Sequence, residues 1–338
     1  MSRTLQHFTD QLRSLPAPPA DARRELSLDT QALFSALLTN EFRAQHGPDG
    51  LAQADAVMRQ YNEGVVRCRS GQLPEALAEL RRGDECLATL APELVAYTAL
   101  FQLSGWGYYY YKAGQAERAV ALMRQGLGLS ATLERQGHQA LIYRRIEQLQ
   151  NIATIYGKQQ QFEAASQLLK NTAIFIHAGR AEDLFIDDWD AGSLRQVQAL
   201  QETTLYNVCR QLAELDTLTL THAVGPGADY FHHAVGPDLL AGLEATTYDR
   251  TVLYNWLYVK ASYYTQSPEA FFENVLAFLA DGSVAPRYGV FQANLLAQAS
   301  GHIRQQGLAH GEGLLATVDA VADRARTWAG RRPARLAA

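Results

Sequence analysis

The sequence predicts an all-α protein built from successive antiparallel helical hairpins, and two observations carry this prediction. A frame of glycine, glycine and alanine, separated by six and then four residues, occurs twice without a gap, as Gly64–Gly71–Ala76 and Gly107–Gly114–Ala119. The segments between these positions contain few glycines or prolines, which is typical of helices. A hydrophobic content of 47% over 338 residues is enough to bury a large core.

Each frame position has a physical role in a helical hairpin. The small first residue lets the second helix approach closely, and the glycine seven residues later tolerates left-handed backbone angles in the turn. The alanine is expected where the two helices cross. A weaker third frame places Ala153 and Gln160 where the glycines stand, followed by Ala165. We therefore expect three equivalent hairpins.

These marks resemble the tetratricopeptide repeat, with units at residues 57–90, 100–133 and 146–179. The frames are 43 and then 46 residues apart, longer than the usual repeat of about 34 residues. Such long repeats resemble those of bacterial peptide-sensing regulators, the Rap phosphatases and pheromone-responsive transcription factors. The resemblance implies a right-handed superhelical array, an α-solenoid, whose concave groove binds a peptide or a partner protein.

The chain divides into three predicted regions. Residues 1–50 contain two amphipathic segments separated by a proline-rich break and end in the turn Gly47–Gly50, which indicates an N-terminal helical cap or small bundle. Residues 51–330 form the repeat domain, with an irregular connection at 217–248, and residues 331–338 form a flexible basic tail. Ser267 followed by Pro268 predicts a helix start, and a last hairpin is expected around 304–321.

Composition and missing motifs narrow the function. A formal charge of −5 argues against nucleic acid as a partner. Three cysteines without C-x-x-C spacing, an N-terminus without an apolar stretch and the lack of a membrane-length apolar run predict a cytoplasmic protein that is not membrane-bound. Nucleotide-binding and hydrolase motifs are missing. We expect no cofactor, and a scaffold or regulator rather than an enzyme, with a homodimer left open.

The alternative is an all-α enzyme, or an accessory subunit of one, with a site near Asp187 and Asp188 or near His232 and His233. The acidic run Asp187-Asp188-Trp189-Asp190 resembles the metal-binding aspartates of terpene synthases. No second metal motif accompanies it, so the sequence favours a turn that caps a helix starting near Ser193.

A histidine group, formed by His222, His232 and His233, lies in the irregular segment. Zinc sites demand three or four convergent ligands, and no further ligand set at a typical spacing accompanies these histidines apart from Asp229 and Asp238. We predict no metal site there.

Asparagines are the most informative polar residues. Asn62 and Asn151 stand two residues before the small residue of their frames, and Asn207 and Asn255 occupy similar places in weaker repeats. An amide offers a donor and an acceptor that match one peptide unit, so the resemblance implies a ladder that grips a peptide backbone. Bonds between helices are the alternative role. The candidate side-chain readers are Tyr108, Tyr111, Arg67 and Arg144.

Overall fold

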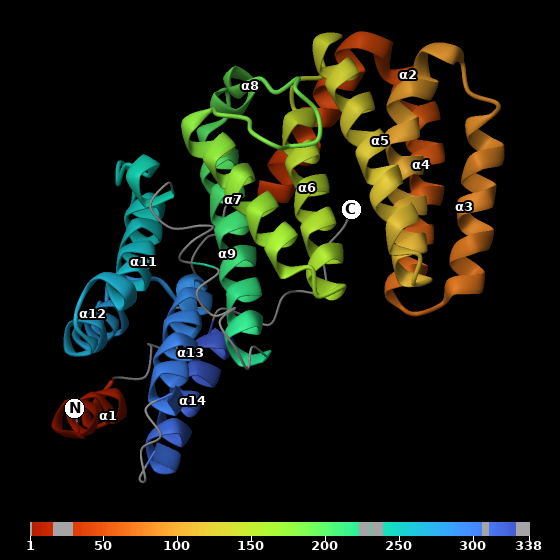
Figure 1. Ribbon diagram of the computed structural model, residues 1–338. Helices are drawn as coiled ribbons and strands as arrows, with labels where there is room; N and C mark the ends of the chain where they lie inside the picture. The colour runs from red at the N-terminus through yellow and green to blue at the C-terminus, as the bar shows by residue number, and fades with distance from the viewer. Residues whose placement is uncertain (1, 16–29, 223–230, 232–238, 306–310, 329–338) are drawn as a thin grey trace. The chain divides into compact units, whose positions relative to one another are not determined.

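The computed structural model describes residues 2–15, 30–222, 231, 239–305 and 311–328, and all regular elements in these residues are helices (Figure 1). The predicted all-α class is confirmed for this part of the chain. The helices form two units. We call residues 30–161 and 179–204 the hairpin unit, and the remaining described residues the C-terminal unit. The predicted 1–50 cap is thereby shared between the two.

The hairpin unit consists of helices that follow one another as packed neighbours. Its elements are α2 (Thr30–Arg69), α3 (Leu73–Leu87), α4 (Pro92–Lys112), α5 (Ala116–Arg135), α6 (Leu141–Lys158) and the short α8 (Ala191–Arg195). Helix α2 packs against α3 and α4, α4 against α3 and α5, and α5 against α6 (Figure 1). The pairs α2–α3 and α4–α5 are the first and second predicted hairpins.

Turns at the predicted glycines have the same backbone geometry. Gly71 and Gly114 have positive φ values of 76° and 78°. In each turn the amide one residue further on bonds back to the helix, from Gln72 N to Arg67 O at 3.0 Å and from Gln115 N to Tyr110 O at 2.8 Å. This is the bond that ends many helices at a left-handed residue. The predicted turns are therefore confirmed.

The third frame makes the same turn without glycine. Gln160 has a φ of 61°, and Gln161 N donates to Tyr156 O at 2.9 Å. A left-handed conformation costs a residue with a side chain about 1–2 kcal/mol. Gln160, which replaces the turn glycine in the third frame, is therefore in a strained conformation.

Close approach of the helices explains the first frame glycine. A Cβ atom on Gly64 of α2 would lie 2.7 Å from Leu80 Cδ2 of α3, and one on Gly105 of α4 would lie 2.9 Å from the same atom. Leu80, which is fully buried, is thus held between two glycines. Ala76 and Ala119 are also fully buried, as predicted.

Helix α2 contains the predicted turn at residues 47–50 as a kink. Gly47 has φ 71° and ψ 177°, and the helix resumes at Pro48, where a missing N–H costs nothing at a helix start. The segment before the kink supports α6. Glu41 accepts bonds of 3.1 Å from the backbone N–H of Ala140, just before α6 begins, and Phe34 packs edge-on against Tyr143.

The C-terminal unit contains the remaining helices. They are α1 (Ser2–Ser14), α7 (Phe162–Ala178), α9 (Gln198–His222, from Leu205 onward), α11 (Tyr248–Thr265), α12 (Pro268–Ala280), the 3-10 turn η3 (Pro286–Tyr288), α13 (Gly289–Gln305) and α14 (Gly311–Trp328). The predicted last hairpin is α13–α14, and Ser267 caps α12 by accepting from Ala270 N. Helix α1 packs on α12 and α14, with Phe8 4.7 Å from Phe272 between ring centroids.

A buried polar network joins three helices of this unit. Lys260 of α11 donates to Asp216 of α9 at 2.7 Å and to Gln298 of α13 at 3.2 Å. Asn294 donates to Asp216 at 2.6 Å and accepts from Trp256 at 3.1 Å. Burial lowers the pKa of Lys260, while Asp216 opposes that shift. Because each partner is satisfied, the network fixes helix positions.

Parts of the predicted irregular connection at 217–248 are helical. Residues 217–222 continue α9, residues 239–242 are helical, and α11 begins at Tyr248. His232 and His233 lie outside the described residues.

Candidate functional site

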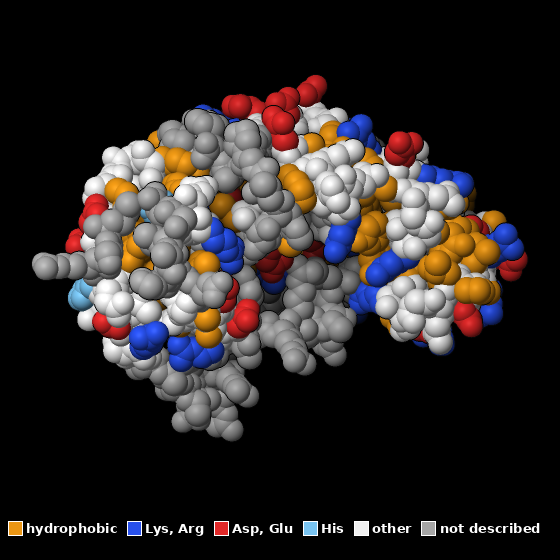
Figure 2. All heavy atoms as spheres, turned by 60° about the horizontal axis from the view of Figure 1, so that its bottom comes forward, with side chains coloured by type: hydrophobic (Ala, Val, Ile, Leu, Met, Phe, Trp, Pro, Cys, Tyr) orange, Lys and Arg blue, Asp and Glu red, His pale blue; other side chains and the backbone are white. Residues whose placement is uncertain are grey.

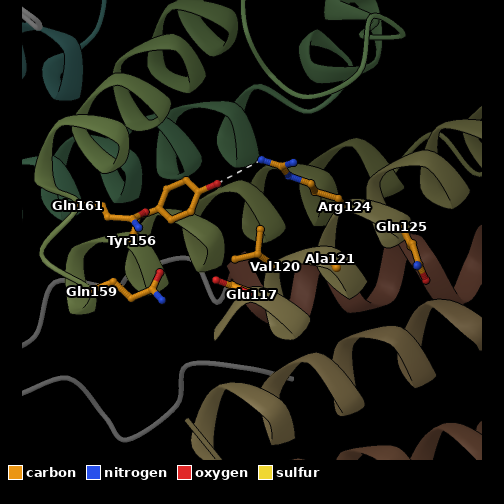
Figure 3. A pocket seen from close by; sticks show the side chains of 8 residues that line it. All are labelled: Glu117, Val120, Ala121, Arg124, Gln125, Tyr156, Gln159 and Gln161. Carbon is orange, nitrogen blue, oxygen red and sulfur yellow. Dashed lines mark hydrogen bonds between the residues drawn. The ribbon is translucent and has the colours of Figure 1, made fainter. Parts of the chain in front are cut away.

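An open pocket of about 580 Å³ lies between α5 and α6 in the hairpin unit (Figure 3). Helix α5 contributes one side, and the end of α6 with the strained turn after it contributes the other. The lining residues are Glu117, Val120, Ala121, Arg124, Gln125, Tyr156, Gln159 and Gln161.

The α5 side of the pocket is a stripe along one helix face. Glu117, Val120 and Arg124 are three and four residues apart, so they project from the same side of the helix. The stripe begins with an exposed acid, continues with the apolar pair Val120 and Ala121, and ends with an exposed base. Val120 is 8% exposed and anchors the apolar floor to the core.

Glutamine amides surround this floor. Gln125, Gln159 and Gln161 are exposed, and none of the described residues hydrogen-bonds to their side chains. Each amide carries donors and acceptors, so the pocket offers several uncommitted partners for a peptide backbone. The turn at Gln160 places Gln159 and Gln161 beside the pocket.

Arg124 contacts the hydroxyl of Tyr156 and the ring of Phe185. Its Nη2 donates to the Tyr156 hydroxyl at 3.2 Å (Figure 3), and its guanidinium carbon lies 4.1 Å from the centroid of the Phe185 ring. A guanidinium has five N–H donors, so most of them stay available. Stacking and the Tyr156 bond hold the group in a fixed place, which lowers the entropy lost on binding an anion.

Phe185 belongs to the loop after residue 178 and is unusual in two ways. It is 36% exposed, and its φ of 68° lies in the left-handed region, where a bulky residue is an outlier. Its neighbour Leu184 is 2% exposed. The buried leucine fixes the loop and directs the phenylalanine outward. Strained residues of this kind concentrate at functional sites.

Ionic contacts fix the other end of the loop. Asp188 pairs with Arg135, and its carbonyl accepts from Arg145. The Arg145 guanidinium lies 3.9 Å from the Trp189 ring and bonds Glu134 at 2.7 Å. Burial raises the pKa of Glu134 to about 7, against the opposing effect of Arg145.

The predicted capping role of the acidic run is confirmed. Asp190 is the N-cap of α8 and accepts from Gly192 N at 2.7 Å and Ser193 Oγ at 2.9 Å. These bonds lower the pKa of Asp190. Together with the Asp188 pair, they give the acidic run a structural role in positioning the loop.

The predicted asparagines are divided between the two units. Asn62 on α2 and Asn151 on α6 belong to the hairpin unit, whereas Asn207 on α9 and Asn255 on α11 belong to the C-terminal unit. None of the described residues hydrogen-bonds to the four side chains. The missing ladder position in the second repeat, Gly105, is explained by its close approach to Leu80. The ladder stays a prediction.

The predicted side-chain readers have different surroundings. Arg67 pairs with Glu63 at 2.9 Å on the surface of α2. Arg144 is 5% exposed, donates to Ser104 at 2.9 Å and stacks on Phe101 at 4.4 Å, so it joins α6 to α4. This burial gives Arg144 a structural role in the hairpin unit.

Tyr108 and Tyr111 form a partly exposed group on α4. Their ring centroids are 6.0 Å apart, and the Lys112 ammonium lies within 6 Å of both. Figure 2 shows apolar side chains exposed beside Lys and Arg side chains on the face of the molecule that it presents. This group is suited to contact a partner.

The described residues form neither a metal-binding cluster nor a membrane-spanning helix. No three His, Cys, Asp or Glu side chains among them lie close enough together to hold a metal ion, and the side chain of His222 is not described. None of the described helices has both the length and the apolar composition of a membrane-spanning segment.

Comparisons with protein-family models, curated proteins and solved structures found no match to this chain. The site must therefore be judged on its geometry. None of the residues predicted to bind lines the α5–α6 pocket. Two signals in the sequence point to it, namely the acid–apolar–base stripe of α5 and the glutamine at the left-handed position of the third frame.

Proposed function

We propose that this chain is a polypeptide-binding protein and that the α5–α6 pocket is a binding site for an extended segment of its partner. The observation that carries the proposal is the combination of an apolar floor with uncommitted amides around it. Val120 and Ala121 accept an apolar side chain, and the glutamine side chains pair with backbone groups of the ligand. Phe185 adds an exposed aromatic ring next to the pocket.

The lining supports recognition better than catalysis. It contains one carboxylate, Glu117, and no histidine, cysteine or serine. General acid–base catalysis needs a positioned donor and acceptor pair, and covalent catalysis needs an activated nucleophile. An open pocket lined by amides and one aromatic hydroxyl is suited instead to a ligand that brings its own backbone donors and acceptors.

A second candidate for the same function is the predicted groove, with Asn62 of α2, Tyr108 and Tyr111 of α4, and Asn151 of α6 as its binding residues. The resemblance to tetratricopeptide proteins implies binding there, and the α4 tyrosines with Lys112 support it. The proposed binding of a polypeptide is common to both surfaces, and experiment can separate them.

The test is selection of peptides from a random display library on the purified full chain, followed by fluorescence polarisation with the enriched peptides. The blocking variant is Ala121→Trp, because Ala121 is an exposed pocket residue and an indole there fills the floor. The matched control is Ala78→Trp on α3, an exposed alanine at the same frame position of the first hairpin, 43 residues earlier.

We expect Ala121→Trp to weaken binding at least about tenfold, which corresponds to about 1.4 kcal/mol, and Ala78→Trp to leave it unchanged. Loss of binding in Asn62→Ala and Asn151→Ala, with Ala121→Trp unaffected, would move the site to the predicted groove. Failure to enrich any peptide would refute the proposal.

A further inference from the structure

We infer that the α5–α6 pocket selects a segment of mixed charge, in which a basic residue and an acidic residue flank an apolar one. The inference rests on the proposed function and specifies its ligand. It is carried by the stripe on α5, where Glu117 and Arg124 stand at opposite ends of the apolar floor.

The charges at the two ends are free to meet a ligand. Glu117 and Arg124 are both exposed, and none of the described residues forms an ion pair with either. Arg124 is already held by Tyr156 and Phe185. A base on the ligand therefore belongs beside Glu117, and an acid belongs beside Arg124.

Helix geometry sets the spacing of these charges. Seven residues of α-helix separate Glu117 from Arg124 along the axis by about 10.5 Å. A polyproline II segment brings residues three apart to one face at about 9 Å, and a β-strand brings residues four apart to one face at about 13 Å. The ligand should therefore place its charges three positions apart in a polyproline II segment or four positions apart in a β-strand. In the strand, the residue midway between the charges lies on the same face, and an apolar side chain there lies over Val120.

Like charges oppose a ligand of uniform charge. A peptide with two acids places one of them beside Glu117, and a peptide with two bases places one of them beside Arg124. Repulsion of that kind is a common source of specificity at interfaces. The pocket should therefore discriminate against peptides of the same spacing whose two charges have the same sign.

The experiment compares libraries selected on the wild-type chain and on the variant Arg124→Glu, with thermal melts to confirm folding. We expect wild-type peptides to carry one base and one acid at the stated spacing, and the variant, which has an acid at both ends of the floor, to enrich peptides with two bases. Each peptide should bind the mismatched protein about three- to tenfold more weakly, as expected for exposed charge pairs, and less so at high salt.

Arg81→Glu on α3 is the matched control, because Arg81 is exposed at the frame position equivalent to Arg124; it should not change the signs of the enriched charges. Peptides that depend on Ala121 but carry no charge pattern, or a mixed-charge pattern that Arg124→Glu also enriches, would overturn this inference while leaving the proposed function intact. A spacing of seven residues would also overturn it, because it indicates a helical ligand. If no enriched peptide depends on Ala121, the pocket proposal fails and this inference fails with it.

Discussion

The two junctions between successive hairpin helices, α3–α4 and α5–α6, share a sequence frame but differ in how they are filled. At the first, the Asp84 carboxylate accepts from Tyr61 at 2.9 Å, Gln102 at 2.7 Å and Trp106 at 3.1 Å. The ring of Tyr110 is stacked on Trp106 and covered by Arg118 at 3.8 Å. Polar and aromatic side chains of the protein itself fill this junction.

At the second junction, the frame equivalents of Asp84 and Trp106 are Leu127 and Ile152, both fully buried. The equivalent of Tyr110 is Tyr156, which lines the open pocket. Replacing a tryptophan by a smaller isoleucine leaves the outer part of the junction open. One repeat pattern can therefore produce either a closed packing contact or an open pocket, depending on the side chains at two positions.

The largest expected effect tests the closed junction. Asp84→Leu places at the first junction the leucine that occupies the equivalent position, 127, at the second. It also removes the carboxylate that accepts from three donors, and each buried donor left unpaired costs about 1–3 kcal/mol. The free energy of unfolding from urea denaturation should fall accordingly. Asp84→Asn, which keeps an acceptor oxygen, should cost less. Equal stability of Asp84→Leu and wild type would show that the hydrogen bonds to Asp84 do not stabilise the junction.

Replacing the first glycine of each frame by alanine should have a smaller effect on stability, with opposite signs in the two hairpins. Gly64→Ala should destabilise the fold by about 1–3 kcal/mol, because Leu80 is also blocked by Gly105 and cannot move away. Gly107→Ala should stabilise it by about 0.5–1 kcal/mol, since a Cβ there would lie 3.6 Å from its nearest neighbours and alanine is the better helix former. Urea denaturation measures the change in the free energy of unfolding for both substitutions. Destabilisation by both substitutions to the same degree would remove this difference between the hairpins.

Sequence reasoning succeeded where a local rule decides the structure. The Gly71 and Gly114 turns, the Ser267 cap and the Asp190 cap each depend on a few neighbouring residues. It did not anticipate the burial of Arg144, the left-handed Phe185 or the pocket, because these depend on residues distant in the chain. The helical residues 217–222 also differ from the irregular connection that was predicted to begin at residue 217.

The smallest expected effect concerns the turn beside the pocket. Gln160→Gly should stabilise the protein by about 0.5–1 kcal/mol by relieving left-handed strain, whereas Gly114→Ala should destabilise it by about 1 kcal/mol. Thermal melts can measure both. If the turn serves to place Gln159 and Gln161, the stabilised Gln160→Gly variant should bind selected peptides no better than wild type. A lower stability of Gln160→Gly than of the wild-type protein would contradict the inference that the left-handed conformation of Gln160 is strained.

Hydrogen–deuterium exchange of the full chain, with and without a selected peptide, can locate the binding site. We expect slower exchange at residues 117–125 and 156–161, and unchanged exchange at residues 74–82, the frame equivalent of 117–125 in the first hairpin. Protection confined to other parts of the chain, with residues 117–125 and 156–161 unaffected, would show that the α5–α6 pocket is not the binding site.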